Sequence, residues 1–430
     1  MFWLGVLALV LGLLVSIAWH EIGHLVPAKA FGVRVTQYMV GFGATVFSRR
    51  HGETEYGLKA IPLGGYIRMV GMYPTDAMLA PAGAATRDPG SATGVRRTLR
   101  QIAADARSYS AEEMLPGDEP RTYARLSAPR KVIVMLGGPL ANLVLAVALL
   151  AVVYLGIGLP TATTTIAQVS PCVTSTECTA ADPASPAQQA GIEPGDVVVS
   201  WDGQATTTWG EVQSAILAGQ GASADVVVRR EGQPRTLTVT PTLVEREDAN
   251  GDLTQVPVVG ITPTAALQRA DLGTFARDLG AMIGGTIGVV VTLPAQLWDV
   301  AAATITGTDR SEGVLGLVGV GRLAGEATST TSSVGVMGNV IVLLQMVASL
   351  NVALFAFNLI PLLPLDGGHV LGALVEGGRR RLARWRGRPD PGLLDTSRFV
   401  PVSYVVVIAL LAMFVLLLVA DVVAPVTLSG

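Results

Sequence analysis

The fold is decided by residues 12–31, which read GLLVSIAWHEIGHLVPAKAF. The run is apolar apart from His20, Glu21 and His24, with Lys29 near its end. Two imidazoles and a carboxylate are costly to bury in so hydrophobic a segment, so they need partners or a metal ion. An α-helix turns by about 100° per residue, which places both histidines on one face. His20 and His24 can therefore bind one Zn²⁺ ion, with Glu21 beside the remaining coordination position as a general base for a bound water.

The H-E-x-x-H pattern is short, so its place in the chain has to support the zinc interpretation. In a soluble helix such a pattern arises by chance, and most single histidines there are not metal ligands. A membrane offers no water to hydrogen-bond polar groups that lack partners. This favours a metal site here, with His20 and His24 as ligands and Glu21 as the general base. A catalytic zinc also needs a third protein ligand elsewhere in the chain.

Composition places the chain among integral membrane proteins. Half of the 430 residues are hydrophobic and 15% are charged, whereas soluble proteins average about 25% charged residues. The net charge of −3 and the lack of a basic stripe interleaved with aromatic residues argue against nucleic acid as a partner. Residues 1–25 contain no Lys or Arg, so we expect them to be retained rather than cleaved as a signal peptide.

Four apolar segments predict an α-helical polytopic membrane protein, because a helix needs about 20 residues to cross a bilayer. Lys and Arg gather after the first segment, before the second and after the third, and such clusters mark the cytoplasmic side. The histidines then lie toward the cytoplasmic face, and both chain termini lie outside. The predicted transmembrane helices are 1–25, 132–157, 336–375 and 401–424, and a basic cytoplasmic loop, 376–400, joins the last two.

Residues 26–131 are predicted to be cytoplasmic and to include a re-entrant β-hairpin. Between positions 56 and 71, glycines and a proline oppose a helix, while aromatic and branched residues favour strands. A hairpin that dips toward the metal would offer a strand edge to an extended substrate, with Gly64 and Gly65 as candidate substrate-binding residues. An ordinary surface hairpin is the alternative. One helix is expected near 96–108.

Residues 161–263 are predicted to form one extracytoplasmic domain. The stretch 185–196 reads SPAQQAGIEPGD and resembles the A-G-I-x-x-G-D signature of bacterial PDZ domains. PDZ domains bind extended peptides or chain ends by strand addition, so this domain would admit substrates or exclude them by size; a purely structural module is the alternative. Cys172 and Cys178 predict a local disulfide in an oxidising compartment, and two free thiols otherwise.

Residues 272–335 contain an apolar stretch, 282–297, that is rich in glycine and interrupted at Pro294. At 16 residues it is short for a full span, so we expect interfacial or re-entrant helices here. A further transmembrane span here would invert the predicted membrane orientation of every later segment. The arginines between 379 and 388 argue against that inversion.

Asp366 is the predicted third zinc ligand, because the topology brings it to the depth of the two histidines near the cytoplasmic end of its span. His369 is a rival, one turn away if the region is helical. Asp366 is preferred because Pro361 and Pro364 unwind the chain just before it and free its side chain to point at the metal.

Two asparagines at membrane depth are further candidates for substrate binding. Asn142 lies in the second predicted span and Asn358 in the third. An amide side chain can hydrogen-bond the backbone of an extended segment. For both residues, polar packing between helices is the alternative.

In this order and spacing, the motifs resemble those of the site-2 proteases, which are membrane-embedded zinc metalloproteases. Each motif is weak alone, and together they span nearly the whole chain. They are His20-Glu21-x-x-His24 on the first span, Gly138-Pro139-x-x-Asn142 on the second, the PDZ signature, and Asn358-x-x-Pro361 followed by Leu365-Asp366-Gly367 on the third.

The resemblance is to the PDZ-containing bacterial subgroup, and it implies both a location and a substrate class. It implies a protein of the bacterial plasma membrane that cuts single-span membrane proteins, such as anti-sigma factors, after a first protease has trimmed their external domain. One departure is the stretch 316–319, which reads GLVG where relatives commonly have a proline. This departure leaves the conformation of that loop open.

Two functions of other classes compete with proteolysis. One is a catalytically silent membrane scaffold that binds partners through its PDZ domain and holds a structural zinc. Glu21 argues against it, since a structural site has no use for a base. The other is a metal transporter, which would require ligands across the whole bilayer, and none is visible in the outer halves of the predicted spans. The sequence therefore favours a zinc protease with four transmembrane helices, a re-entrant β-hairpin and one extracytoplasmic PDZ domain.

Overall fold

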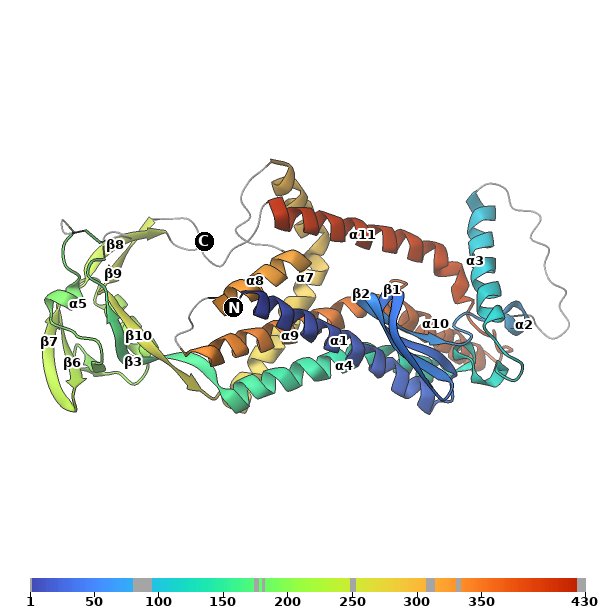
Figure 1. Ribbon diagram of the computed structural model, residues 1–430, viewed down its shortest axis with the longest axis horizontal. Coiled ribbons are helices and arrows are strands. Elements are labelled where there is room, and N and C mark those ends of the chain that lie inside the picture. The colour runs from blue at the N-terminus through green and yellow to red at the C-terminus, as the bar shows by residue number, and fades with distance from the viewer. Residues whose placement is uncertain are drawn as a thin grey trace. The chain divides into compact units, whose positions relative to one another are not determined.

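The computed structural model describes residues 2–79, 95–173, 178–179, 182–247, 253–306, 314–329 and 334–423, and the chain divides into two compact units. We name them the helical unit and the sheet unit after their main elements, which Figure 1 labels. The helical unit comprises Met1–Val153, Leu272–Thr330 and Asn339–Gly430. The sheet unit comprises Tyr154–Asp271 and Thr331–Gly338.

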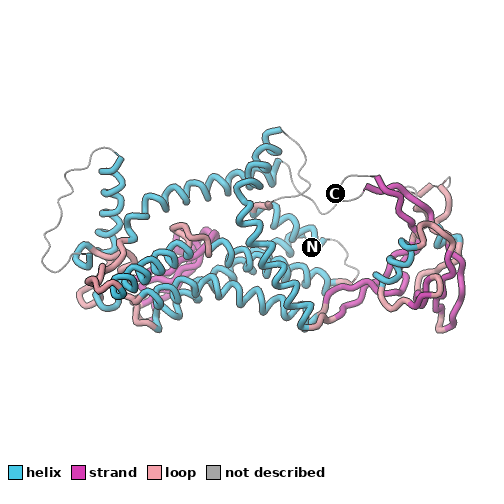
Figure 2. The backbone as a smooth tube through the Cα atoms, turned by 180° about the vertical axis from the view of Figure 1, so that it is seen from behind, coloured by secondary structure: helices cyan, strands magenta, loops and turns pink. Residues whose placement is uncertain are grey.

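Five helices of the described residues are long and apolar enough to cross a membrane. All five show large hydrophobic side chains on their outer surfaces, as expected for helices surrounded by lipid. In Figure 2 these helices are among the cyan coils that make up most of the helical unit. They are α1 (Phe2–Ala30), α4 (Ala128–Ala151, continued by a π-helical turn at Val152–Ile157), α7 (Leu272–Thr306), α9 (Val336–Asn358) and α11 (Val400–Val423).

α7 is longer than the short element predicted from the sequence. It is the reason that five helices are long and apolar enough to cross a membrane, where four spans were predicted. It is one helix of 35 residues with Pro294 inside it. The sequence prediction judged the element by its 16-residue apolar stretch, but hydropathy marks only where a segment is apolar, and the helix continues through the charged residues on either side. Figure 1 shows α7 crossing the direction of α1, α4 and α9. Near its end, Val300 packs against Leu417 and Ala420 of α11.

The predicted third span, 336–375, consists of two helices, and the break between them lies where Pro361 and Pro364 were predicted to unwind the chain. α9 ends at Asn358, and α10 (Asp366–Trp385) begins after a turn that contains both prolines. Inside the bundle, the buried Asn351 of α9 donates a hydrogen bond to Ser16 Oγ of α1 at 2.7 Å. This contact holds α9 against the helix that carries the H-E-x-x-H motif.

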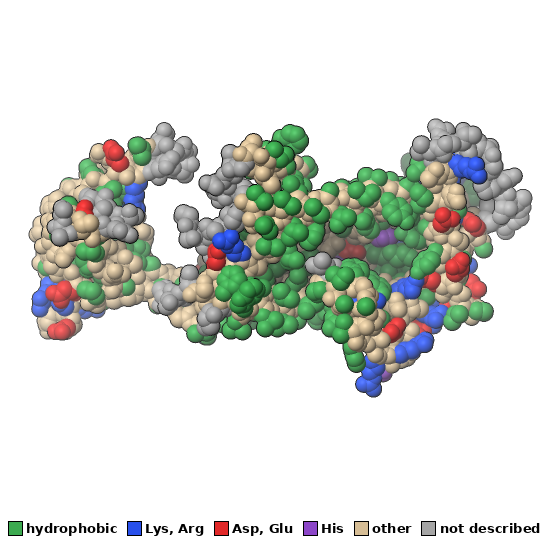
Figure 3. All heavy atoms as spheres, turned by 45° about the horizontal axis from the view of Figure 1, so that its top comes forward, with side chains coloured by type: hydrophobic (Ala, Val, Ile, Leu, Met, Phe, Trp, Pro, Cys, Tyr) green, Lys and Arg blue, Asp and Glu red, His purple; other side chains and the backbone are tan. Residues whose placement is uncertain are grey.

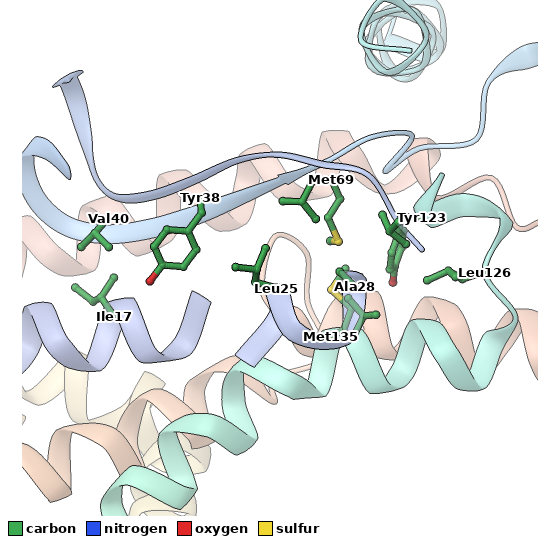
Figure 4. Packing of buried hydrophobic residues seen from close by; sticks show 12 residues of the cluster. Ile17, Leu25, Ala28, Tyr38, Val40, Met69, Tyr123, Leu126 and Met135 are labelled. Carbon is green, nitrogen blue, oxygen red and sulfur yellow. The ribbon is translucent and has the colours of Figure 1, made fainter. Parts of the chain in front are cut away.

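The predicted re-entrant β-hairpin is a sheet of two long strands, in which one part of the first strand pairs with the second strand along both of its edges. In β1 (Val35–His51), Gln37–Val40 pair on one edge with residues 65–68 of β2 (Thr54–Met69) and on the other with residues 55–58 of the same strand. Tyr38 fixes the sheet to α1 by donating a hydrogen bond to the Ala18 carbonyl at 2.8 Å. Figure 4 shows the apolar packing beneath, where strand residues face α1 and α4.

The remaining short helices surround this core. Within the predicted cytoplasmic segment 26–131, a helix is present where one was expected near 96–108, and residues 80–94 lie outside the described residues. The helices are α2 (Asp76–Leu79), α3 (Val95–Glu112), α8 (Leu317–Ser329) and the 3₁₀ turns Glu119–Arg121, Tyr123–Arg125 and Thr396–Phe399.

The stretch 316–319, whose conformation the sequence left open, forms the entry to α8. The backbone N–H groups of Gly316 and Gly319 donate to the carboxylate of Asp421 in α11, at 3.2 and 2.7 Å. A β-carbon at either glycine would lie within 3 Å of that carboxylate. The acid of a distant helix therefore caps α8, and a proline is not needed to begin it.

The sheet unit is built on the strand order β10-β3-β4-β6-β7, with β5 paired to β4 and a separate β8–β9 hairpin. Its core includes Ile166, Trp201 and Val226, and Cys172 is bonded to Cys178 with a Cα–Cα distance of 5.7 Å. The unit begins before and ends after the predicted 161–263, because β3 begins at Leu159 and β10 ends at Gln268. The elements are β3 (Leu159–Val169), α5 (Pro186–Gln189), β4 (Val197–Trp201), β5 (Gln204–Ala205), α6 (Trp209–Ala218), β6 (Ala224–Arg230), β7 (Gln233–Val239), β8 (Thr242–Glu247), β9 (Leu253–Val258) and β10 (Ile261–Gln268).

Candidate functional site

Three side chains from α1 and the start of α10 converge in the helical unit. His20 Nε2 and His24 Nε2 lie 3.1 Å apart, and each lies 3.3 Å from Asp366 Oδ2. Within the described residues, these three form a group of acids and histidines whose donor atoms all lie close enough to share a metal ion. Figure 3 shows a hollow in this unit with hydrophobic walls and with acidic and histidine side chains at its floor.

The donor set fits zinc. Zinc sites are tetrahedral with Zn–N and Zn–O bonds of about 2.0–2.2 Å, which sets neighbouring donor atoms about 3.3–3.5 Å apart. The separations of 3.1 to 3.3 Å between the three donor atoms are close to this range. Asp366 Oδ2 is buried and has no hydrogen-bond partner. A buried carboxylate oxygen without a donor is costly, and a cation would satisfy it.

Asp366 reaches the histidines because α9 stops before it. Pro361 and Pro364 lack backbone N–H groups, and two such residues so close together disfavour a helix over this stretch; Leu365 has an extended backbone just before α10 begins. A β-carbon at Gly367 would lie 2.4 Å from the carbonyl oxygens of Leu359 and Ile360. The glycine after Asp366 is therefore required for the chain to fold back over the end of α9.

The second ring nitrogen of each histidine faces α4. His24 Nδ1 lies 2.8 Å from the Val134 carbonyl oxygen, so it carries a proton and leaves Nε2 free for a metal. His20 Nδ1 lies 3.1 Å from the side-chain amide of Asn142, which is fully buried. The amide atom placed there is Nδ2, and Asn142 Oδ1 is buried without a partner; turning the amide over puts Oδ1 against Nδ1, and Asn142 then fixes the same tautomer in His20. One helix thus orients both imidazoles.

α4 approaches the histidines this closely because it carries small residues there. A β-carbon at Gly138 would lie 2.2 Å from His24 Nε2, and one at Gly137 would lie 2.0 Å from the Gly23 carbonyl oxygen. Only glycine fits at these positions. The sequence showed the small residues of the second span, but their contact with the histidine rings requires the packing of two helices.

Glu21 is buried beside the sheet formed by β1 and β2. A β-carbon at Gly65 would lie 2.9 Å from Glu21 Cγ, and the backbone of Ile67 is within hydrogen-bond reach of the carboxylate. Glu21, which the sequence predicts to be the general base, thus lies next to both the histidine pair and a β-strand. A peptide bond held beside this strand would lie near Glu21.

The other sequence candidates lie around this centre at different distances. Gly64 has a positive φ of 113° and stands against the Phe42 ring, which shapes the bend of the strand beside Gly65. The Asn358 amide donates to the Leu354 carbonyl of its own helix. His369 lies outside the group of three donors and lines an apolar cavity of about 290 Å³ beside the turn that precedes Asp366.

Several polar contacts that support the site escaped the sequence interpretation. Lys131 at the start of α4 forms a buried ion pair with Glu376 of α10 at 2.8 Å, and Asn351 binds Ser16. These pairs fix α4 and α9–α10 around α1. The signal in the sequence was a charged or polar residue inside an apolar helix, but the sequence does not give the partner.

Comparison with known proteins agrees with this geometry. The model of the family described as Peptidase family M50 matches residues 8–388. Zinc metalloprotease Rip1 of Mycobacterium tuberculosis strain H37Rv is 28% identical over 100% of this chain and 99% of its own length. Metalloprotease MmpA of Caulobacter vibrioides is 26% identical over 89% of both chains. The chain therefore belongs to peptidase family M50, the site-2 proteases, and is a membrane zinc metalloprotease.

Proposed function

We propose that the protein cleaves peptide bonds within the transmembrane segments of single-span membrane proteins, and that anti-sigma factors already trimmed by another protease are its substrates. Membership of the family supports proteolysis within the bilayer. The observation that carries the proposal is the group of three donor atoms about 3 Å apart, with the Glu21 carboxyl beside it, on a helix apolar enough to span a membrane. A hydrolytic site in that setting serves substrates that are themselves in the membrane.

His20, His24 and Asp366 would hold the zinc, and Glu21 would be the general base. When bound, zinc supplies Lewis acidity, which makes water a nucleophile at neutral pH and polarises a carbonyl. The Glu21 carboxylate takes the proton of the attacking water and returns it to the leaving amine. Val134 and Asn142 hold the histidine rings in place, which keeps Nε2 of each aimed at the same point.

The substrate would bind as an extended strand beside β2. A peptide bond within a helix is sterically shielded, so the segment to be cut has to unwind. Main-chain hydrogen bonds to the strand around Gly64 and Gly65 would compensate for the lost helical bonds. Asn358 would contribute a further amide contact. Helix-breaking residues in the substrate are therefore expected to favour cleavage.

The sheet unit would act as an extracytoplasmic PDZ domain. Among the strands of the described residues, β10 lies at one end of the order, so one of its edges has no partner in this sheet. Gly260 just before it has a positive φ of 85°. An open edge preceded by a glycine turn suits addition of a peptide strand. This domain would bind or exclude substrates before they reach the membrane site.

The proposed orientation puts both chain termini and the sheet unit outside and the metal toward the cytoplasm of a bacterial cell. In this arrangement α1, α4, α9 and α11 cross the bilayer, and α7 lies across them near the outer surface. The crossing direction of α7 in Figure 1 and its contact with the C-terminal part of α11 support this placement. A cysteine placed at Arg384 should then resist a membrane-impermeant label in intact cells.

The test is the Glu21→Gln variant, assayed with a single-span substrate that carries no external domain. We expect cleavage to fall by about 10²- to 10⁴-fold, the usual contribution of a positioned base, while zinc stays bound. Trimmed substrate should accumulate in the membranes of cells that carry the variant. Glu112→Gln, at an exposed acid of α3, is the matched control. Full cleavage by Glu21→Gln would reject the mechanism and favour a scaffold with structural zinc.

A further inference from the structure

α10 has two faces of different character. Its inner face is fixed to α4, because Glu376 is buried and pairs with Lys131 at 2.8 Å, and Arg380 approaches the same carboxylate at 3.5 Å. Gly377 lies against Ala128, where an added β-carbon would be 3.0 Å from the alanine side chain. These contacts determine which side of α10 faces away from α4.

The outer face of α10 carries an exposed apolar stripe. At about 100° per residue, positions 371, 374, 375, 378, 382 and 385 fall on one side of a helix, opposite Glu376 and Arg380. Apart from Gly378, these positions are large hydrophobic residues, and all are at least 43% exposed. They are Leu371, Leu374, Val375, Leu382 and Trp385, the last of which is 81% exposed.

Arginines border this stripe on both sides. Arg379 and Arg386 fall along one edge, and Arg381 along the other; all three are exposed. Among the residues that the structure describes, none of the three forms an ion pair with an acid. Free cationic side chains around an apolar stripe are typical of a helix that lies at the surface of an anionic membrane.

The outer part of the stripe lies at the right depth for lipid headgroups. Ala128 is the first residue of α4, so its neighbour Gly377 lies level with that end of the helix. From Gly377 to Trp385 the helix rises about 12 Å further. This distance places Leu382 and Trp385 beyond the end of α4, in the interfacial layer where tryptophan is enriched in membrane proteins.

From these observations we infer that the C-terminal half of α10 binds anionic lipid headgroups. Arg379, Arg381 and Arg386 pair with lipid phosphates, while Leu382 and Trp385 enter the acyl layer beneath them. Because α10 begins at Asp366, the same helix that supplies a metal ligand is attached to the membrane surface. Anionic lipid thereby holds the end of the helix that leads to the site. This inference requires neither the proposed substrate nor the proposed orientation.

The test is a titration of the full-length, detergent-solubilised chain with phosphatidylglycerol, with bound lipids counted by native mass spectrometry. The variant replaces Arg379, Arg381 and Arg386 with glutamine. Each basic residue near an anionic surface contributes about 1 kcal/mol, so roughly a hundredfold loss of affinity is expected. The matched control replaces the exposed arginines 229, 235 and 246 of the sheet unit and should bind as the unaltered chain does.

A second measurement locates Trp385 by fluorescence. In nanodiscs that contain phosphatidylglycerol, brominated acyl chains should quench a component of the emission that is absent from Trp385→Phe. Replacement of the three arginines by lysine should keep lipid binding, because charge and not geometry is the requirement. Equal lipid affinity in the glutamine variant and the control, or a Trp385 quenched only by aqueous iodide, would overturn the inference and point to an acidic protein on this face.

Discussion

Asp366 and Asp196 are both acids withdrawn from solvent, yet their surroundings differ. Asp196 in the sheet unit is fully buried, accepts two hydrogen bonds from Arg230 at 2.8 Å and accepts a third from the Glu193 N–H. Asp366 in the helical unit faces two histidines and has one buried oxygen without a hydrogen-bond donor. A satisfied acid holds a fold together, whereas an unsatisfied acid beside free imidazole nitrogens is prepared for a cation.

Replacement of each acid by alanine should give opposite results, and this is the largest effect we expect. Asp366→Ala should abolish cleavage and lower the zinc content, while hydrogen exchange of the helical unit changes little. Asp196→Ala leaves Arg230 without its main partner, so exchange across β4 and β6 should rise while zinc stays bound. Both zinc content and exchange are measured on the full chain. Loss of zinc in Asp196→Ala would show that the two acids do not have separate roles.

A smaller effect is expected at Gly138, which makes room for the His24 ring. A β-carbon there would lie 2.2 Å from His24 Nε2, so Gly138→Ala should displace the imidazole and weaken zinc binding. Gly321→Ala in α8, where nothing lies within 4 Å, is the matched control. Competition with a chelator gives both affinities. Equal zinc affinity in the two variants would mean that α4 does not constrain the ring.

Asn142 should matter less than Gly138, because it acts through His20 and not by filling space. Loss of an outer partner of a metal ligand typically costs about 10- to 100-fold in metal affinity or activity. Asn142→Leu should show that loss, and Asn142→Asp, which keeps an oxygen to accept from His20 Nδ1, should recover part of it. If Asn142 instead binds only substrate, zinc affinity would be unchanged and KM alone would rise.

The smallest effect concerns pH and the sheet unit. Burial alone would raise the pKa of Asp196, but its hydrogen bonds from Arg230 and the Glu193 N–H hold the pKa below its ordinary value. A pKa lowered by folding adds stability above the unfolded value of about 3.9, and that stability is lost as the pH falls through the folded pKa. Exchange protection of β4 and β6 should therefore fall in acid. Asp196→Asn should flatten this dependence, and Glu245→Gln should not.

The sequence predicted features that depend on local spacing and missed those that depend on partners. A spacing of four residues from His20 to His24 places both rings on one helical face, and two prolines end the helix before Asp366, so the structure has these three side chains together. The length of α7 was missed because apolar character and helical structure end at different residues. The second pairing edge of β1 and the contact of Asn142 with His20 were missed because each joins segments whose approach no local pattern encodes.

The central claim is that His20, His24 and Asp366 hold one zinc ion, and X-ray absorption at the zinc edge tests it most directly. The full chain should show two imidazole nitrogens at about 2.0–2.1 Å and a carboxylate oxygen at about 2.0–2.2 Å. The spectrum should be unchanged in His369→Ala and should lose its oxygen component in Asp366→Ala. A shell of three imidazoles that loses one in His369→Ala would contradict the account and make His369 the third ligand.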